Sequence, residues 1–325
     1  MDWPIIVLLI ALGVFIVLPG LISITVIPPI IFDVIAARKK PEKWSREHPS
    51  GSNPGIVEMW GESLRFREKY KDVESEIEAT SADGIHLKGL YYDFGSDTAV
   101  LILGGRPETC IYSLYYAYPY AENKVNVCVL DPRAHGLSEG IYSGCGYKEQ
   151  EDLLAFAKVL IQRGIKKIIL HGICVGSCAS TFLATREDCP KEIKGLITDG
   201  LFIHYYEQLK KRIAKNKGPV YPTAWIFRHK IKKLYGIDCS KVGPISVLPS
   251  LRLPCLMMAS KEDIFSLPKN TQLLFDINGS PDKKMEWFEH GPHSHLRRVD
   301  TEHYDRCVSD FIRKIQSQDE IMPTE

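Results

Sequence analysis

The stretch that decides the fold is HGICVGS, residues His171 to Ser177. It stands between an apolar run, KKIIL at 166–170, and a stretch with helical spacing from about residue 175 to 186. Gly172 and Gly176 flank Cys174, as a sharp strand-to-helix turn requires, because side chains there would collide with neighbouring backbone. The pattern predicts that Cys174 projects from a strand end at the N-terminus of a helix.

Strand-like and helix-like stretches alternate on both sides of this turn, from about residue 73 to 318. We expect a hairpin of strands 73–80 and 85–92, and further strands at 99–105, 126–131, 166–170, 195–199, 254–260 and 285–290. Helical spacing predicts helices at 147–163, 175–186, 267–275 and 302–316. Such alternation is typical of a mostly parallel sheet with helices on both faces, which is an α/β architecture.

Four more motifs surround the turn in a fixed order. They are LILGGRPET at 101–109, DPRAHGLSEG at 131–140, PISVLPSLRLPCLMMASKEDIF at 244–265 and EHGPHSHLR at 289–297. Together with HGICVGS, they resemble the motifs of the α/β-hydrolase superfamily over roughly residues 75–318. Among its members, the pattern is most similar to membrane-tethered hydrolases and to the S33-type esterase, lipase and peptidase group. The resemblance implies an α/β-hydrolase fold with a cap insertion.

The resemblance also implies a catalytic triad. Cys174 takes the place of the family's usual serine, as in the Cys-His-Asp set of the dienelactone hydrolases, and a helix N-terminus favours its thiolate form. Asp263 matches the family acid and His293 the family histidine. Glu262 remains an alternative acid, and His295 an alternative base.

The oxyanion hole is expected to use two backbone N–H groups. Val175, directly after the nucleophile, supplies one, and by resemblance Arg106 supplies the other. The implied function is hydrolysis of ester or thioester (acyl) bonds. An acyltransferase and a catalytically silent scaffold or ligand-binding protein of the same fold are the alternatives. No cofactor and no metal are expected, because the nine cysteines form no CxxC pair and the histidine loop has no clustered acidic ligands.

An uncharged apolar run extends from Trp3 to Phe32 and is long enough to cross a membrane. A cleaved signal peptide is the competing interpretation, but the run is too long and has no basic start. We expect Pro28 and Pro29 to end this helix. Basic residues then dominate positions 38–46, which predicts that the globular part lies on the cytoplasmic side.

The expected organisation is therefore an anchor at 1–32, a juxtamembrane connector at 33–72, a hydrolase domain at 73–318 and a disordered tail at 319–325. A cap insertion is expected at about 203–243. Its residues 208–233 hold nine Lys or Arg and no Asp or Glu. They are interpreted either as a solvated basic face or as a lid that touches an anionic membrane surface. The expected partners are an acyl ester, thioester or lipid substrate and the membrane, and not nucleic acid.

Overall fold

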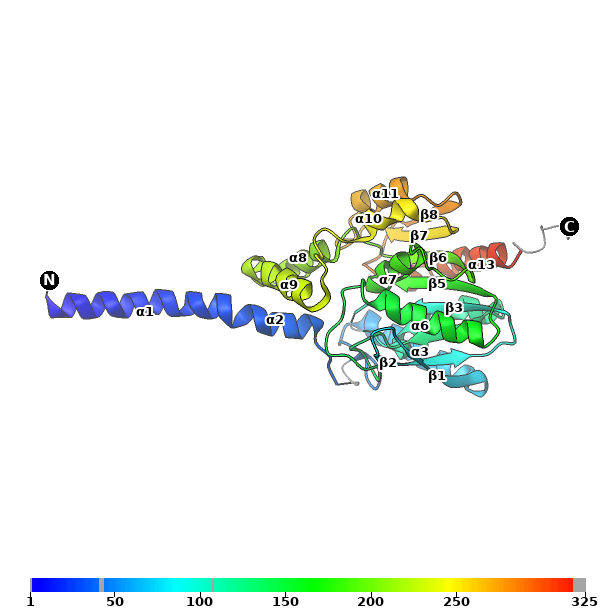
Figure 1. Cartoon of the computed structure of the whole chain (residues 1–325), viewed down its shortest axis with the longest axis horizontal. Coiled ribbons are helices and arrows are strands. Elements are labelled where there is room, and N and C mark those ends of the chain that lie inside the picture. Colours follow the sequence, from blue (N-terminus) through cyan, green and yellow to red (C-terminus); the bar gives the residue numbers. More distant parts are fainter. Residues whose placement is uncertain (1, 41–43, 107, 318–325) are drawn as a thin grey trace.

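The computed structural model describes residues 2–40, 44–106 and 108–317. Its centre is an eight-stranded sheet of order β1-β2-β4-β3-β5-β6-β7-β8 (Figure 1). The strands are β1 (Glu74–Thr80), β2 (His86–Tyr92), β3 (Thr98–Leu103), β4 (Asn126–Leu130), β5 (Lys167–Ile173), β6 (Ile193–Asp199), β7 (Cys255–Ser260) and β8 (Lys283–Phe288). β2 pairs antiparallel with β1 and β4, and every later pairing is parallel. The predicted hairpin and mostly parallel sheet are confirmed.

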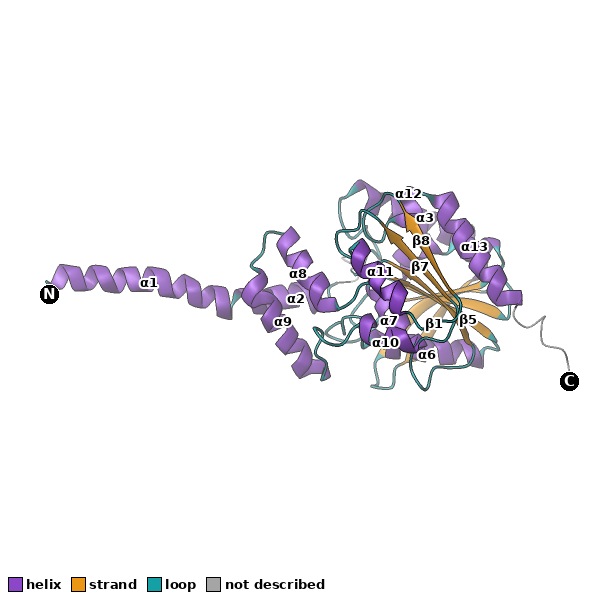
Figure 2. Ribbon diagram, turned by 90° about the horizontal axis from the view of Figure 1, so that it is seen from above, coloured by secondary structure: helices purple, strands orange, loops and turns teal. Residues whose placement is uncertain are grey.

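Two layers of helices cover the sheet (Figure 2). On one side lie α6 (Glu149–Gln162), α7 (Val175–Ala184), α10 (Pro244–Val247) and α11 (Pro268–Ile277). On the other lie α3 (Pro54–Lys69), α12 (Leu296–Val299) and α13 (Thr301–Ser317). The short helices α4 (Cys110–Ser113) and α5 (Tyr118–Glu122) pack against α3 and α13, respectively. Every residue of β3, β4 and β5 is buried, as expected for central strands covered on both faces. The carboxyl ends of these strands therefore meet at one rigid edge.

The N-terminal apolar run forms two helices, α1 (Trp3–Thr25) and α2 (Ile27–Ala36). The expectation that Pro28 and Pro29 end the helix is wrong, because they occupy the first turn of α2. Proline is tolerated there, since the N–H groups of the first turn have no helical acceptor. By length and composition, the stretch Trp3–Ala36 could cross a membrane. No described side chain of α1 is buried, and α1 points away from the domain (Figure 1).

The stretch interpreted as a connector contributes to the core. α3 lies within it, begins at an Asn53 cap and buries Met59 and Phe66 completely. Asn53 accepts a hydrogen bond from the N–H of Gly55, which satisfies one otherwise unpaired donor of the first turn. The tail expected at 319–325 lies outside the described residues.

The insertion between β6 and β7 carries α8 (Tyr205–Lys215) and α9 (Val220–Tyr235), which stand beside α2 (Figure 1). Phe32 of α2 contacts the rings of Tyr142 and Phe227, at 5.2 and 5.0 Å between centroids. Ala36 is buried in the same cluster, together with Leu209, Ile213, Ala224, Ile231 and Ile237. This small second core fixes α2 against the cap.

Candidate active site

The turn at Cys174 has the geometry that its sequence predicts. β5 ends at Ile173, α7 begins at Val175, and Cys174 between them has φ 54° and ψ −110°. A side chain at Gly172 or Gly176 would approach backbone oxygens of Gly176 or Leu103 to 2.3 and 1.9 Å. Only glycine fits at either position, and the strained turn places the thiol at the edge of the sheet.

His293 and Asp263 meet beside this thiol. Nδ1 of His293 lies 2.7 Å from Oδ2 of Asp263, whose other oxygen accepts hydrogen bonds from the N–H groups of Phe265 and Ser266. Asp263 is buried, and these bonds fix its orientation. Nε2 of His293 is buried and has no hydrogen-bond partner among the described residues. That nitrogen is therefore available for a proton from the thiol or from substrate.

The pKa of His293 reflects these neighbours. Burial alone would lower it, but negative charge on the Cys174 sulfur and the hydrogen bond to Asp263 raise it to about 10. The thiol thus lies close enough to the imidazole to affect its pKa. This arrangement places a basic imidazole beside the thiol, as a cysteine nucleophile requires.

The alternative acid Glu262 and the alternative base His295 line a cavity at Cys174 but do not pair with His293 or Asp263. His290 is exposed and pairs with Glu262, at 3.0 Å between Nδ1 and Oε1. The side chain of His295 has no hydrogen bond to either carboxylate among the described residues, and burial lowers its pKa. The hydroxyl of Ser177 donates to the carbonyls of Gly172 and Asp199 and so stabilises the turn at Cys174. Of the sequence candidates, only His293 and Asp263 come together at Cys174.

The loop after β3 approaches the thiol from the other side. A side chain at Gly105 would lie 3.1 Å from Cβ of Cys174, so this backbone is close to the nucleophile. The N–H of Gly105 already donates to Oε2 of Glu108, at 2.7 Å. The N–H of Val175 has no intrahelical acceptor, because Val175 is the first residue of α7. The position of Arg106 directly after Gly105 is compatible with its expected oxyanion role.

Glu108 is a site residue that sequence reasoning missed. Burial raises the pKa of its carboxyl group to about 7, although the Gly105 N–H opposes this shift. It lines a cavity with Cys174 and His293. Glu108 directly follows the motif GGRP in the sequence, which was the available signal, but the sequence could not show that its side chain contacts the N–H of Gly105.

The predicted loop at 131–140 supports the fold. Asp131 accepts hydrogen bonds from the N–H groups of Cys110 and Leu137. Arg133 forms a buried ion pair with Asp152, and the His135 ring lies 4.2 Å from that of Trp44. Asp131, Arg133 and His135 line neither cavity at Cys174. Their role is structural.

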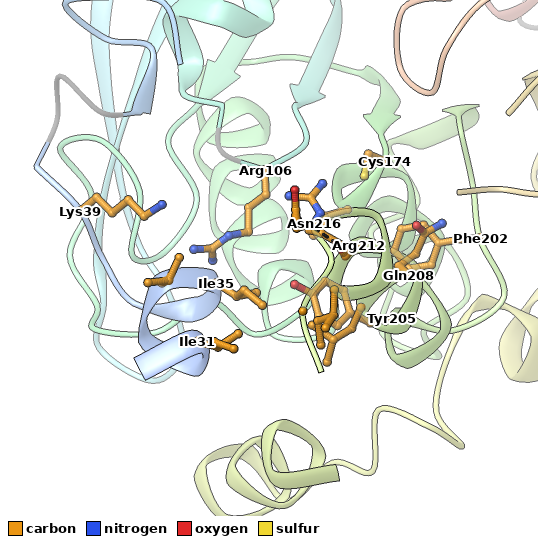
Figure 3. Close-up of a pocket in the computed structure, with 15 residues that line it drawn as sticks. Ile31, Ile35, Lys39, Arg106, Cys174, Phe202, Tyr205, Gln208, Arg212 and Asn216 are labelled. Carbon is orange, nitrogen blue, oxygen red and sulfur yellow. Dashed lines mark hydrogen bonds between the residues drawn. The ribbon is translucent and has the colours of Figure 1, made fainter. Parts of the chain in front are cut away.

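Two cavities meet at Cys174. One, of about 440 Å³, lies between α2 and α8 and is drawn in Figure 3. The other, of about 620 Å³, lies on the side of His293. Four described residues line both: Arg106, Cys174, Arg212 and Asn216. The thiol therefore stands at a junction that could hold the two parts of a substrate on opposite sides of the scissile bond.

The basic residues of the cap do not form one face. Nζ of Lys211 donates to the carbonyl of Phe265, while Arg212 and Lys215 lie over the Phe265 ring, at 5.9 and 5.1 Å from its centroid. These three side chains of α8 thus turn toward the acid loop. Lys230 of α9 lies over Phe32, beside the N-terminal helices.

One group of ligand-type side chains among the described residues is close enough to hold a metal ion. It consists of Glu286, His303 and Cys307 on β8 and α13. None of them lines either cavity at Cys174. The group is therefore separate from the candidate active site.

Comparison with known proteins identifies the fold of this chain. No family model matches the chain. YqkD, an uncharacterised protein of Bacillus subtilis (strain 168), is 27% identical over 247 residues, which are 74% of this chain and 79% of that protein. An esterase from Pyrococcus furiosus superposes with a TM-score of 0.63 at 23% identity, covering 75% of this chain and 93% of its own. The α/β hydrolase GrgF from Penicillium gives 0.57 at 16% identity, with coverages of 74% and 98%. This chain has the α/β-hydrolase fold.

Proposed function

We propose that the chain is a membrane-anchored hydrolase of ester or thioester bonds. Cys174 is the nucleophile, His293 the general base and acid, and Asp263 the residue that orients His293. One observation carries the proposal. The Cys174 thiol stands on a strained turn beside His293, whose Nδ1 lies 2.7 Å from the buried carboxylate of Asp263. Solved esterases share the fold, which supports hydrolysis of esters.

In the proposed reaction, the Cys174 thiolate attacks the acyl carbonyl, and the N–H groups of Val175 and Arg106 stabilise the oxyanion. The bond to the alcohol or thiol then breaks, and the leaving group takes the proton from Nε2 of His293. An acyl-cysteine remains. Water gives a proton to the same nitrogen as it attacks, and collapse of the second tetrahedral species releases the carboxylic acid and restores the thiol.

The test compares two cysteines. If exposure governs reactivity, iodoacetamide should modify Cys189 first, because it is the most exposed of the nine cysteines. Burial also raises the pKa of Cys189, to about 11. We expect Cys174 to react faster at pH 7, and its modification to abolish hydrolysis of acetyl thioesters.

Substitution provides the second measurement. Cys174→Ala should lower kcat by about 1,000-fold or more, whereas Cys189→Ala should keep it. Cys174→Ser should also lose most of the rate, because a hydroxyl is far harder to deprotonate than a thiol. A wild type without acyl hydrolysis, or a serine variant that gains it, would contradict the proposal and indicate a silenced enzyme.

We also propose that α1 spans the membrane and leaves the catalytic domain on the cytoplasmic side. Its 23 residues correspond to about 35 Å of helix, against a hydrocarbon core of about 30 Å. The basic residues after α2 support the orientation. The full chain should stay in the membrane after an alkaline carbonate wash, and protease added on the cytoplasmic side should digest the domain. Release by the wash would disprove the anchor.

A further inference from the structure

The cavity between α2 and α8 has a wall supplied by the N-terminal helices. Ile31, Val34 and Ile35 of α2 line it opposite Leu209 and Ile213 of α8. Val34 is 57% exposed and so lies where the cavity opens to the surroundings. The part of the cavity between these five side chains is thus apolar, and Cys174 also lines the cavity (Figure 3).

The position of α2 is well defined. Besides the Phe32 contacts, the N–H of Arg38 donates to the carbonyl of Ile141, and its guanidinium contacts the carbonyls of Gly136 and Ser138. If α1 spans the membrane, Ile31 lies about 9 Å beyond its end, at 1.5 Å per residue. That distance corresponds to the headgroup region. With α1 in the membrane, the opening of the cavity lies near the membrane surface.

Three cations line the same cavity: Lys39, Arg106 and Arg212. No Asp or Glu is found among the described residues that line it. Arg106 is the most enclosed of the three. Its guanidinium lies 4.8 Å from the Trp44 ring centre and 3.4 Å from the carbonyl oxygen of Ala36.

Nη2 of Arg106 is buried and has no hydrogen-bond partner among the described residues. No described carboxylate forms an ion pair with the Arg106 guanidinium. An enclosed cation without an acid partner is costly unless an anion compensates it. Arg106 and Arg212 also line the second cavity, so this positive charge stands at the junction beside the thiol. An acyl chain on one side and an anionic leaving group at the junction would match both features.

We propose that the cavity binds an acyl lipid whose leaving group carries a phosphate, and that this lipid enters from the membrane between α2 and α8. The acyl chain lies along the α2 wall, and the phosphate contacts Arg106 and Arg212. As a substrate assignment, the proposal rests on the proposed function. The binding site itself can be tested without turnover.

The binding test uses the full chain with Cys174→Ala, in nanodiscs of phosphatidylcholine. Decyl phosphate and decanol are titrated, and a change in tryptophan fluorescence that is absent in a Trp44→Phe variant reports occupancy, because the Trp44 ring contacts Arg106. We expect decyl phosphate to bind at least about 10-fold more tightly, because charge-assisted hydrogen bonds to the phosphate are lost with the alcohol. Equal affinities would overturn the anionic site, and inorganic phosphate binding as tightly as decyl phosphate would overturn the acyl site.

Matched variants locate the two contacts. Arg106→Gln should bring the ratio of the two affinities close to 1, whereas Lys233→Gln, an exposed cation of α9 that does not line the cavity, should leave it unchanged. Ile35→Gln should place a polar amide in the apolar wall and weaken binding of decyl phosphate about 10-fold. Ile30→Gln is its control, because Ile30 is exposed on the same helix and does not line the cavity. Equal effects within either pair would contradict the assignment.

Turnover by the wild type then identifies the source of the substrate. Acyl glycerol phosphate in vesicles should be hydrolysed at least about 10-fold faster than monoacylglycerol in the same vesicles. A soluble acyl-coenzyme A preferred over the vesicle substrate would overturn entry from the membrane. If even a short acetyl thioester is not hydrolysed, the proposed function fails, while the binding ratios still decide whether the site exists.

Discussion

Gly200 supports the His293 ring, and a single methyl group there should disturb the triad. Gly200 follows β6 with φ 67°, and a Cβ added to it would lie 2.8 Å from Cε1 of His293. Its backbone cannot easily retreat, because its N–H donates to the carbonyl of Met258 and its own carbonyl accepts from Ser266. In Gly200→Ala the imidazole must therefore move by about 0.6 Å to restore ordinary contact.

A displacement of this size should cost about 10-fold to 100-fold in kcat, because catalytic groups tolerate little misplacement. The left-handed backbone should add a stability cost of about 1–2 kcal/mol, whatever the ring does. Gly84→Ala separates the two effects. Gly84 has φ 82° and nothing within 4 Å of an added Cβ, so it carries the backbone cost alone.

The assay measures kcat for an activated short-chain ester, the rate of Cys174 alkylation at pH 7 and the midpoint of thermal unfolding. Both variants should unfold at lower temperature than the wild type. Only Gly200→Ala should lose kcat and alkylation rate. If Gly200→Ala keeps kcat within about twofold of Gly84→Ala, the ring of His293 does not need the position described here, and its proposed role is wrong.

Three further outcomes are expected. Because the folded state raises the pKa of His293 to about 10, its stabilising contribution should be complete below about pH 6.5 and disappear as the pH rises to 10. The difference in unfolding free energy between wild type and His293→Ala should therefore shrink across this range, and a constant difference would contradict the raised pKa of His293. Burial raises the pKa of Glu108 to about 7, because it disfavours the charged carboxylate. The wild type should therefore lose stability relative to Glu108→Gln as the pH rises from about 4.5 to 7. Parallel pH–stability curves of the two proteins would contradict the raised pKa of Glu108. Asp152→Ala should destabilise the protein by about 3–5 kcal/mol in thermal or denaturant unfolding, because the buried Arg133 keeps only the half-exposed Asp83 as a described partner. A loss of stability below about 1 kcal/mol would show that the Arg133–Asp152 pair is not needed.

The sequence predicted the sheet and the turn at Cys174 because both depend on local patterns. Apolar runs, helical spacing and the two glycines act over a few residues, and each is visible in the chain. The order of the motifs also placed Asp263 and His293 in loops that meet at one sheet edge.

Features that depend on long-range packing were not predictable in this way. His293 and His295 stand two residues apart in one loop, and only the folded backbone shows which ring faces Asp263. The approach of Glu108 to Gly105 depends on the path of a loop, which composition does not encode. Pro28 was misjudged because a proline that would end one helix can equally begin the next.

The docking of α2 on the cap has a consequence for how soluble forms of this protein should be designed. A fragment that begins at residue 73 would lack Phe32 and Ala36, and would also lack the Met59 and Phe66 side chains of α3. The apolar partners of all four would then face water and promote aggregation. A fragment that begins at Ile27 keeps both helices and loses only α1, so it is the better starting point for expression and crystallisation.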